Sequence, residues 1–152
     1  IPALATSRER FKRRAEWKLA ANIEAREGSP LEAMLDGDPN TGYFTQGFKP
    51  FPVEWLTIEL PAASTIVGIE IDSRGEKFKD GKDIGWAPAY SVEVSDDGET
   101  WKKVVPSVIG EPHARLNLAS PIVARHLRIA ITEKEGWQPW VIKELNLYGE
   151  EG

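Results

Sequence analysis

The sequence of 152 residues contains no cysteine. This absence excludes a disulfide scaffold, thiol catalysis and cysteine metal sites, but leaves the compartment open, because many extracytoplasmic domains also lack cysteine. No apolar run approaches membrane-spanning length, and no signal peptide is visible. Because the chain begins with Ile1 rather than Met, we expect it to be processed or excised from a longer protein.

Catalytic motifs are missing as well. The sequence has no Gly-x-Ser-x-Gly elbow, no His-Glu-x-x-His and no glycine-rich phosphate loop. Its two histidines are expected to be structural, His113 in a proline-containing turn and His126 facing solvent from a strand. Carboxylates are plentiful, but no spacing marks a glycosidase-like pair. The sequence therefore does not predict an enzyme.

Charge and size exclude other classes. A net charge of −5 argues against nucleic acid binding, which needs a basic face. The length fits one domain, and the hydrophobic content of 41% is ordinary for a globular fold. Residues 1–16 are interpreted as a solvated lead-in, with a possible short helix over residues 6–16.

Alternating apolar residues predict many short strands. Leu56, Ile58 and Leu60 share one face, and Pro61 is expected to end that strand. Further strands are predicted over residues 66–71, 90–94, 101–105, 114–118, 127–131 and 141–148, with an Asp-Gly hairpin turn at 97–98. Two long polar loops, residues 72–88 and 132–139, interrupt the pattern. The pattern is typical of a single all-β sandwich.

The segment 35–41 gathers turn-forming and oxygen-bearing residues in one short loop. Gly37 and Pro39 exclude both a helix and a central strand. Side-chain oxygens and backbone carbonyls of such a loop can converge, as a hard cation such as calcium requires. The spacing is not that of an EF-hand, because Thr41 stands where that loop needs glycine. A plain Asx-type turn is the alternative.

The sequence has six tryptophans, a high number for its length. Core packing is expected for Trp17, Trp55 and Trp101, which lie at or within predicted strands. The others, Trp86, Trp137 and Trp140, lie in or beside the two long loops, where an exposed ring can stack on the apolar face of a sugar. The alternative is that Trp140 covers the end of the sandwich and Trp86 packs under its own loop.

The order of these features resembles the discoidin, or coagulation factor 5/8 type C, domain. The resemblance runs from about Trp17 to Gly149, close to the whole chain. Six segments carry it: Trp17–Asn22, Ala33–Thr41, Glu54–Leu60, Tyr90–Trp101, Ala124–Ile129 and Ile142–Gly149. Among bacterial relatives the sequence is most similar to the family 32 carbohydrate-binding modules. The resemblance implies a jelly-roll β-sandwich (galactose-binding-domain-like) over residues 17–149, followed by a tail at 150–152.

The resemblance also implies two sites. A structural calcium would be held by the Leu35 and Asn40 carbonyls, the Asp38 carboxylate, Thr41 and Glu144. Sugar would be bound by loops at one end of the sandwich. The candidate sugar-binding residues are Arg74, Trp137, Tyr43, Phe44 and Trp86. Galactose-binding members often carry a histidine where this sequence has Phe44, so the resemblance does not extend to galactose specificity.

The sequence thus predicts a non-catalytic module that binds a glycan weakly, carried by a larger secreted, periplasmic or cell-surface bacterial protein that degrades glycans. Tethering to that polypeptide raises a weak affinity. The rival hypothesis is a structural or protein-interaction domain, with Trp86 and Trp137 anchoring a neighbouring domain. Membrane binding is disfavoured because acidic residues crowd the loops. The isolated domain is expected to be a monomer.

Overall fold

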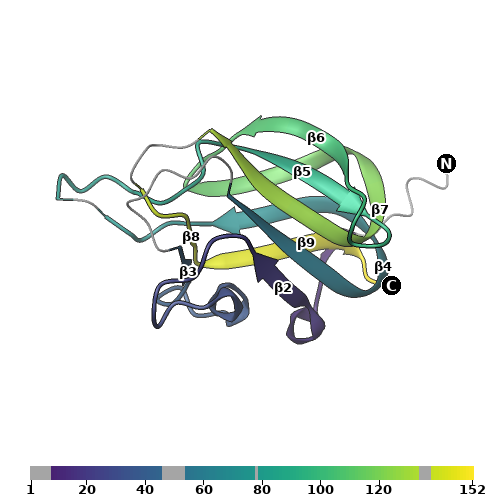
Figure 1. The fold of residues 1–152 in the computed structure, drawn as a ribbon, viewed down its shortest axis with the longest axis horizontal. Helices are drawn as coiled ribbons and strands as arrows, with labels where there is room; N and C mark the ends of the chain where they lie inside the picture. The colour runs from purple at the N-terminus through teal and green to yellow at the C-terminus, as the bar shows by residue number, and fades with distance from the viewer. Residues whose placement is uncertain (1–7, 46–53, 78, 134–137) are drawn as a thin grey trace.

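The computed structural model describes residues 8–45, 54–77, 79–133 and 138–152, and within them the chain is an antiparallel β-sandwich (Figure 1). The all-β class predicted from the sequence is confirmed. Its strands are β1 (Glu9–Arg10), β2 (Lys18–Ala21), β3 (Tyr43–Phe44), β4 (Trp55–Asp72), β5 (Ala89–Ser95), β6 (Lys102–Ile109), β7 (His113–Glu133), β8 (Val141–Ile142) and β9 (Glu144–Glu150). Two short 3₁₀ turns, η2 (Arg14–Glu16) and η3 (Leu31–Leu35), lie between strands.

Strands β4 and β7 run through both layers of the sandwich. The first half of β4 pairs with β2 and with the end of β7, whereas its second half pairs with β9 and with the start of β7. The five-stranded layer thus contains β2, β5, β6 and one half each of β4 and β7. The four-stranded layer contains β1, β9 and the other halves.

The expected strand end at Pro61 is wrong, because β4 continues through it as a bulge. Glu59 pairs with His126 and Ser64 with Ala124, so residues 60–63 stand opposite one residue of β7. Proline lacks a backbone N–H for the ladder and is tolerated in such a bulge. The bulge lets one strand pass from one layer to the other.

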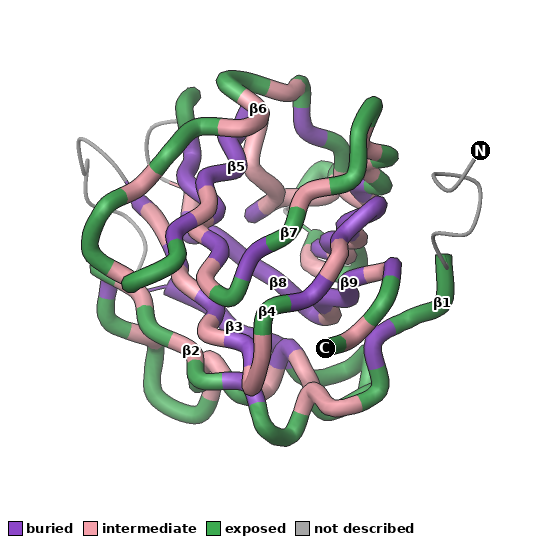
Figure 2. Tube along the Cα trace, turned by 90° about the vertical axis from the view of Figure 1, so that its right-hand side faces the viewer, coloured by how far each residue is buried: buried purple, intermediate pink, exposed green. Residues whose placement is uncertain are grey.

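The core lies between the two layers, and the exposed residues lie around the outside (Figure 2). Alternate residues of both layers fill it, as the period-two pattern predicted. Members from the five-stranded layer include Leu56, Ile58, Val92, Leu127 and Ile129, and those from the four-stranded layer include Ile66, Ile69, Ile71, Leu145 and Leu147.

In the described part of the lead-in segment only Arg14–Glu16 are helical, as the 3₁₀ turn η2. In this segment, Glu9 and Arg10 form β1 on the edge of β9, and the Phe11 N–H donates to the Leu147 carbonyl at 2.8 Å. The Phe11 ring is buried in the core. A short strand that delivers one aromatic side chain to the core cannot be recognised from its charged neighbours.

Two of the three tryptophans expected in the core are only half-buried. Trp17 is buried, but Trp55 and Trp101 lie on the outer side of the five-stranded layer, where the Arg128 guanidinium is 5.8 and 4.5 Å from their ring centroids. Cation–π contact accounts for this placement.

Both histidines also differ from expectation in their surroundings. His126 is half-buried, with its imidazole 3.9 Å from the Glu59 carboxylate, and does not face solvent freely. His113 begins β7 instead of lying in a turn, and its Nε2 is 2.7 Å from Glu70 Oε2. Both imidazoles thus lie beside a carboxylate on a strand.

The Asp-Gly hairpin between β5 and β6 is confirmed. Gly98 takes a positive φ of 79°, and the Asp97 carboxylate accepts the backbone N–H groups of Glu99 and Thr100, both at 2.8 Å. These hydrogen bonds lower the pKa of Asp97 to about 2. In the described ranges, no helix is long and apolar enough to cross a membrane.

Candidate functional site

The loop between β4 and β5, residues 73–88, projects from the end of the sandwich opposite the C-terminus (Figure 1). It is folded back on itself as a hairpin. The Ile84 N–H donates to the Glu76 carbonyl at 3.0 Å, and Lys77 pairs with Asp83 both in the backbone and through a 2.6 Å ion pair. The long loop expected from the sequence is therefore internally bonded, which limits the conformations open to its side chains.

Gly85 joins this loop to β8. Its N–H donates to Gln138 Oε1 at 3.1 Å, and its carbonyl accepts the Val141 N–H at 2.7 Å. Its φ is +89°, and an added Cβ would lie 2.3 Å from Val141 Cγ2. Only glycine fits this position, because any side chain would overlap β8 and strain the backbone.

Lys143 contacts the first residues of the loop 73–88 and the end of β4. Its Nζ is 2.9 Å from Glu76 Oε1, and its side chain is only 7% exposed. Its backbone N–H donates to the Asp72 carbonyl at 2.7 Å. A cation this buried requires a partner, so Glu76 and Lys143 fix the base of the loop together.

Among the predicted sugar-binding residues that the structure describes, Arg74 is the most exposed. Its Nε and Nη2 donate to the two carboxylate oxygens of Asp72, at 2.9 and 2.8 Å, while its side chain is 56% exposed. These hydrogen bonds hold the pKa of Asp72 below its usual value. The bidentate pair fixes the guanidinium plane and leaves Nη1 on the side away from Asp72, suited to a hydroxyl or carbonyl oxygen.

Trp86 lies in the same loop and is half-buried. With Pro88, Ile131, Pro139 and Trp140 it lines a crevice of about 10 Å³, which holds no more than one water. Trp140 itself is buried, as its covering role would require. The indole of Trp86 thus packs against its surroundings and keeps part of its surface outside. Trp137, the predicted aromatic platform, lies outside the described residues.

Tyr43 and Phe44 cannot be ligand platforms, which corrects the prediction from the sequence. They form β3, which pairs with β8, and are 1% and 5% exposed. The Tyr43 hydroxyl donates to the Ile23 carbonyl at 3.2 Å, and burial raises the pKa of Tyr43. A two-residue strand gives no periodicity that would mark these rings as core.

Phe44 has a supporting role. The Arg26 guanidinium lies 4.2 Å from its ring centroid, and Lys143 Nζ lies 5.0 Å from it. The ring therefore stabilises the same lysine that bonds Glu76. Sequence reasoning missed Lys143, because a lysine between apolar strand residues gives no sign of burial.

The segment 36–41 forms two successive Asx turns, as the alternative reading expected. Asp36 Oδ1 accepts the Asp38 N–H and Asp38 Oδ1 accepts the Asn40 N–H, both at 2.9 Å. Asp36 Oδ2 also accepts the Thr41 hydroxyl. Burial raises the pKa of Asp36, but hydrogen bonds from Thr41 and the backbone outweigh it and leave the pKa lowered.

Glu144 reaches this loop from the start of β9. Its Oε1 lies 3.8 Å from where a Cβ on Gly37 would stand. Its Oε2 accepts a hydrogen bond from Arg14 Nη1 at 3.0 Å. The oxygen-only set around the loop fits a hard cation chemically, with Asp36 as a carboxylate that the sequence-based set omitted. The Arg14 guanidinium is a positive charge already present there.

The loop 36–41 does not have the cluster of acidic or imidazole side chains that many metal sites have. Among the residues that the structure describes, no three His, Cys, Asp or Glu side chains group as a metal site would need. The predicted set depends instead on carbonyl and hydroxyl oxygens from Leu35, Asn40 and Thr41. Leu35 ends η3, so its carbonyl lies at the entrance to the loop.

The F5/8 type C domain model matches residues 18–145, and the chain belongs to this family. Among curated protein sequences, none matches the chain.

Solved structures of the same fold include domains of bacterial proteins. The family 32 module of C. perfringens NanJ, in complex with galactose, superposes with a TM-score of 0.73 at 23% identity, covering 88% of this chain and 94% of that one. CpGH89CBM32-5 from Clostridium perfringens, in complex with GalNAc-β-1,3-galactose, gives 0.71 at 20% identity, covering 88% and 96%. The C-terminal domain of a Bacteroides fragilis chitobiase gives 0.76 at 19% identity, covering 95% and 99%. The jelly-roll β-sandwich is thereby confirmed.

Proposed function

We propose that this domain is a non-catalytic carbohydrate-binding module, carried by a larger secreted or cell-surface bacterial protein that acts on glycans. Its family and the sugar complexes of similarly folded family 32 modules support this. The observation that carries the proposal is Arg74, whose guanidinium is oriented by Asp72 yet largely exposed on the projecting loop 73–88.

The proposed binding mode is shallow. Arg74 donates hydrogen bonds to sugar hydroxyls, and the indoles of Trp86 and Trp137 pack against the apolar face of the ring. Because the loop is already held by Gly85 and by the Glu76–Lys143 pair, little conformational entropy is lost on binding. The few contacts give a weak site whose avidity depends on tethering to the parent polypeptide.

The proposal includes a structural calcium at the loop 36–41. The carbonyls of Leu35 and Asn40, the carboxylates of Asp38 and Glu144, and Thr41 would hold it, with Asp36 beside them. A calcium ion supplies only charge neutralisation and cross-linking at such a site. Tying an early loop to the last strand stabilises the folded state, since the unfolded chain offers no such arrangement.

A glycan array on the purified domain tests the main proposal. The wild type should bind a defined set of glycans, and Arg74→Ala, Trp86→Ala and Trp137→Ala should each weaken those signals at least tenfold. Arg74→Lys should also weaken the glycan signals, because lysine keeps the charge but cannot form the bidentate pair with Asp72. Arg125→Ala, which removes a half-exposed arginine on β7, is the matched control.

Two results would overturn the proposal. We call the loop 73–88, with Arg74 and Trp86, the loop end. Glycan signals that survive all three substitutions would show that the sugar binds elsewhere than at the loop end. A folded domain that binds no glycan would favour the protein-interaction hypothesis instead.

A further inference from the structure

The outer face of the four-stranded layer carries a row of polar side chains with a gap in it. In the ladder, Gly68 of β4 stands between Asn117 of β7 and Tyr148 of β9. Two residues further along β4, where side chains face the same side of the sheet, Glu70 stands between Arg115 and Asn146. Because Gly68 has no side chain, the three strands enclose a hollow where a continuous sheet surface would otherwise lie.

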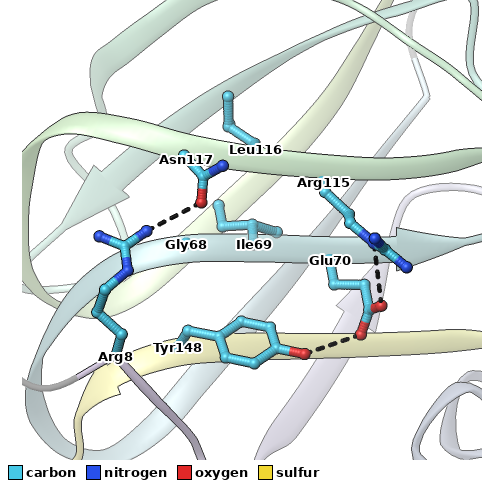
Figure 3. A pocket seen from close by; sticks show the side chains of 8 residues that line it. All are labelled: Arg8, Gly68, Ile69, Glu70, Arg115, Leu116, Asn117 and Tyr148. Carbon is cyan, nitrogen blue, oxygen red and sulfur yellow. Dashed lines mark hydrogen bonds and ion pairs between the residues drawn. The ribbon is translucent and has the colours of Figure 1, made fainter.

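The hollow has a volume of about 320 Å³ (Figure 3). That falls in the range of small-ligand sites, about 300–1,000 Å³. Its walls come from the lead-in segment and from all three strands: Arg8, Ile69, Glu70, Arg115, Leu116, Asn117 and Tyr148 surround Gly68. A Cβ on Gly68 would lie 3.5 Å from the Leu116 carbonyl oxygen and 3.6 Å from Tyr148 Cβ, so the floor has room for a methyl group.

The Tyr148 ring is held in place along one side of the hollow. Its hydroxyl donates to Glu70 Oε1 at 3.1 Å, and Figure 3 shows the ring lying along β9 with that hydroxyl turned toward Glu70. Glu70 also accepts Asn146 Nδ2 at 3.0 Å and lies 2.7 Å from His113 Nε2. Partial burial raises the pKa of Glu70, but these three hydrogen bonds outweigh burial and leave it lowered.

Two guanidinium groups flank the ring. Arg8 extends from the lead-in segment to donate to Asn117 Oδ1 at 2.9 Å. On the other side lies Arg115, 70% exposed, with its Nε 3.9 Å from Glu70 Oε2. The one carboxylate in the hollow is thus engaged by Tyr148, Asn146 and His113. The accessible charge is positive, on a chain whose net charge is −5.

We propose that this hollow is a second binding site, for a sugar ring that carries a carboxylate, such as a hexuronic acid unit of an acidic glycan. The ring packs against Tyr148, and the carboxylate pairs with the guanidinium of Arg115 or Arg8. Asn117 offers its amide to a ring hydroxyl. The site lies on a sheet face and shares no residue with the loop 73–88, so either site can exist without the other.

The test is an NMR titration of the whole domain with a galacturonic acid trisaccharide and with its neutral galactose counterpart. The acidic trisaccharide should shift the Gly68 amide and Tyr148 ring signals, and raised salt should weaken its binding. The neutral trisaccharide should leave those signals unmoved. Equal shifts with both sugars, or acidic binding that moves only Trp86 and its loop, would overturn the proposal.

Two substitutions locate the site independently. Gly68→Ala puts a methyl group on the floor without backbone overlap, and should weaken binding of the acidic trisaccharide about tenfold. Arg115→Gln removes a charge-assisted hydrogen bond and should do the same. Arg125→Gln, on the same strand outside the hollow, is the control and should bind like the wild type. Unchanged affinity in both variants would overturn the proposal, whereas unmoved Trp86 signals with any neutral glycan would count against the loop-end function only.

Discussion

The loop end and the sheet-face hollow orient their binding side chains by different means. At the loop end, Gly85 and the buried Lys143–Glu76 pair hold one irregular segment, and that segment supplies both Arg74 and Trp86. In the hollow, the register between β4, β7 and β9 places the side chains, and each wall comes from a different strand. Loop sites therefore depend on a few special backbone positions, whereas the hollow depends on a side chain that is missing.

The two regions also use their carboxylates in opposite ways. At the loop end, Asp72 pairs with the arginine itself, so Arg74 presents hydrogen-bond donors with its charge already balanced. In the hollow, Glu70 is hydrogen-bonded by Tyr148, Asn146 and His113. Arg8 bonds the neutral Asn117 and Arg115 approaches Glu70 only to 3.9 Å, so the charges of these two arginines are less closely balanced than that of Arg74. We therefore expect neutral hydroxyls to suit the loop end and anions to suit the hollow.

The largest effect is expected from Gly85→Ala. A non-glycine residue at its positive φ costs about 1–2 kcal/mol, and overlap with Val141 adds about 1–3 kcal/mol. The free energy of unfolding, measured with denaturant, should fall by about 2–5 kcal/mol. Glycan binding at the loop end should be lost, while the hollow still binds the acidic trisaccharide.

Gly81→Ala is the matched control for that substitution. Gly81 has a φ of +82° in the same loop, but a Cβ there meets nothing within 4 Å. The Gly81→Ala variant should lose only the conformational contribution to the free energy of unfolding, about 1–2 kcal/mol. Equal losses in both variants would show that the contact with Val141 does not hold the loop.

The second-largest effect is expected from calcium, whose proposed ligand Glu144 stands opposite Asp72 in the ladder between β4 and β9. Calcium at a hundredfold excess over its Kd should stabilise the domain by about 2.7 kcal/mol, and a chelator should reverse this. Glu144→Gln should abolish the response, and Arg14→Gln should strengthen it by removing a competing cation. A melting temperature that changes with neither calcium nor chelator would contradict the calcium proposal.

A pair of isosteric substitutions should separate the regions. Glu70→Gln turns an acceptor that serves three donors into an amide, and should cost about 2 kcal/mol and loosen Tyr148. Glu76→Gln removes the negative charge that pairs with the buried Lys143 and should loosen the loop 73–88 instead. Titrating each variant with the acidic and neutral glycans should give opposite losses. If either variant lost both activities, the two sites would not be independent.

The sequence predicted the features that local patterns determine. Alternation at Leu56, Ile58 and Leu60 located a core strand, and the Asp-Gly pair located the β5–β6 turn. It did not predict that Tyr43 is buried or that Trp55 lies outside, because those outcomes depend on strand partners far along the chain. The resemblance selected Arg74, whose exposure the structure bears out, but its role in binding stays a prediction.

The hollow was invisible in the sequence for the same reason. A glycine inside a strand pattern such as Gly68 marks a close approach or a bulge, and nothing local distinguishes it from a gap left for a ligand. The cross-strand neighbours Asn117 and Tyr148 give it meaning, and they lie about fifty and eighty residues away in the chain. The register between distant strands cannot be read from a single sequence, so the neighbours of Gly68 could not be predicted.

The smallest effect is a pH dependence confined to the hollow. Since the pKa of Glu70 is lower in the folded protein than its ordinary value of 4.5, its ionisation stabilises the fold fully above that value. This contribution should disappear as the pH falls through the folded pKa. The difference in free energy of unfolding between wild type and Glu70→Gln should therefore shrink as the pH falls below about 4.5. A difference that did not change with pH would mean that Glu70 acts through its shape alone, and that charge does not fix the Tyr148 ring.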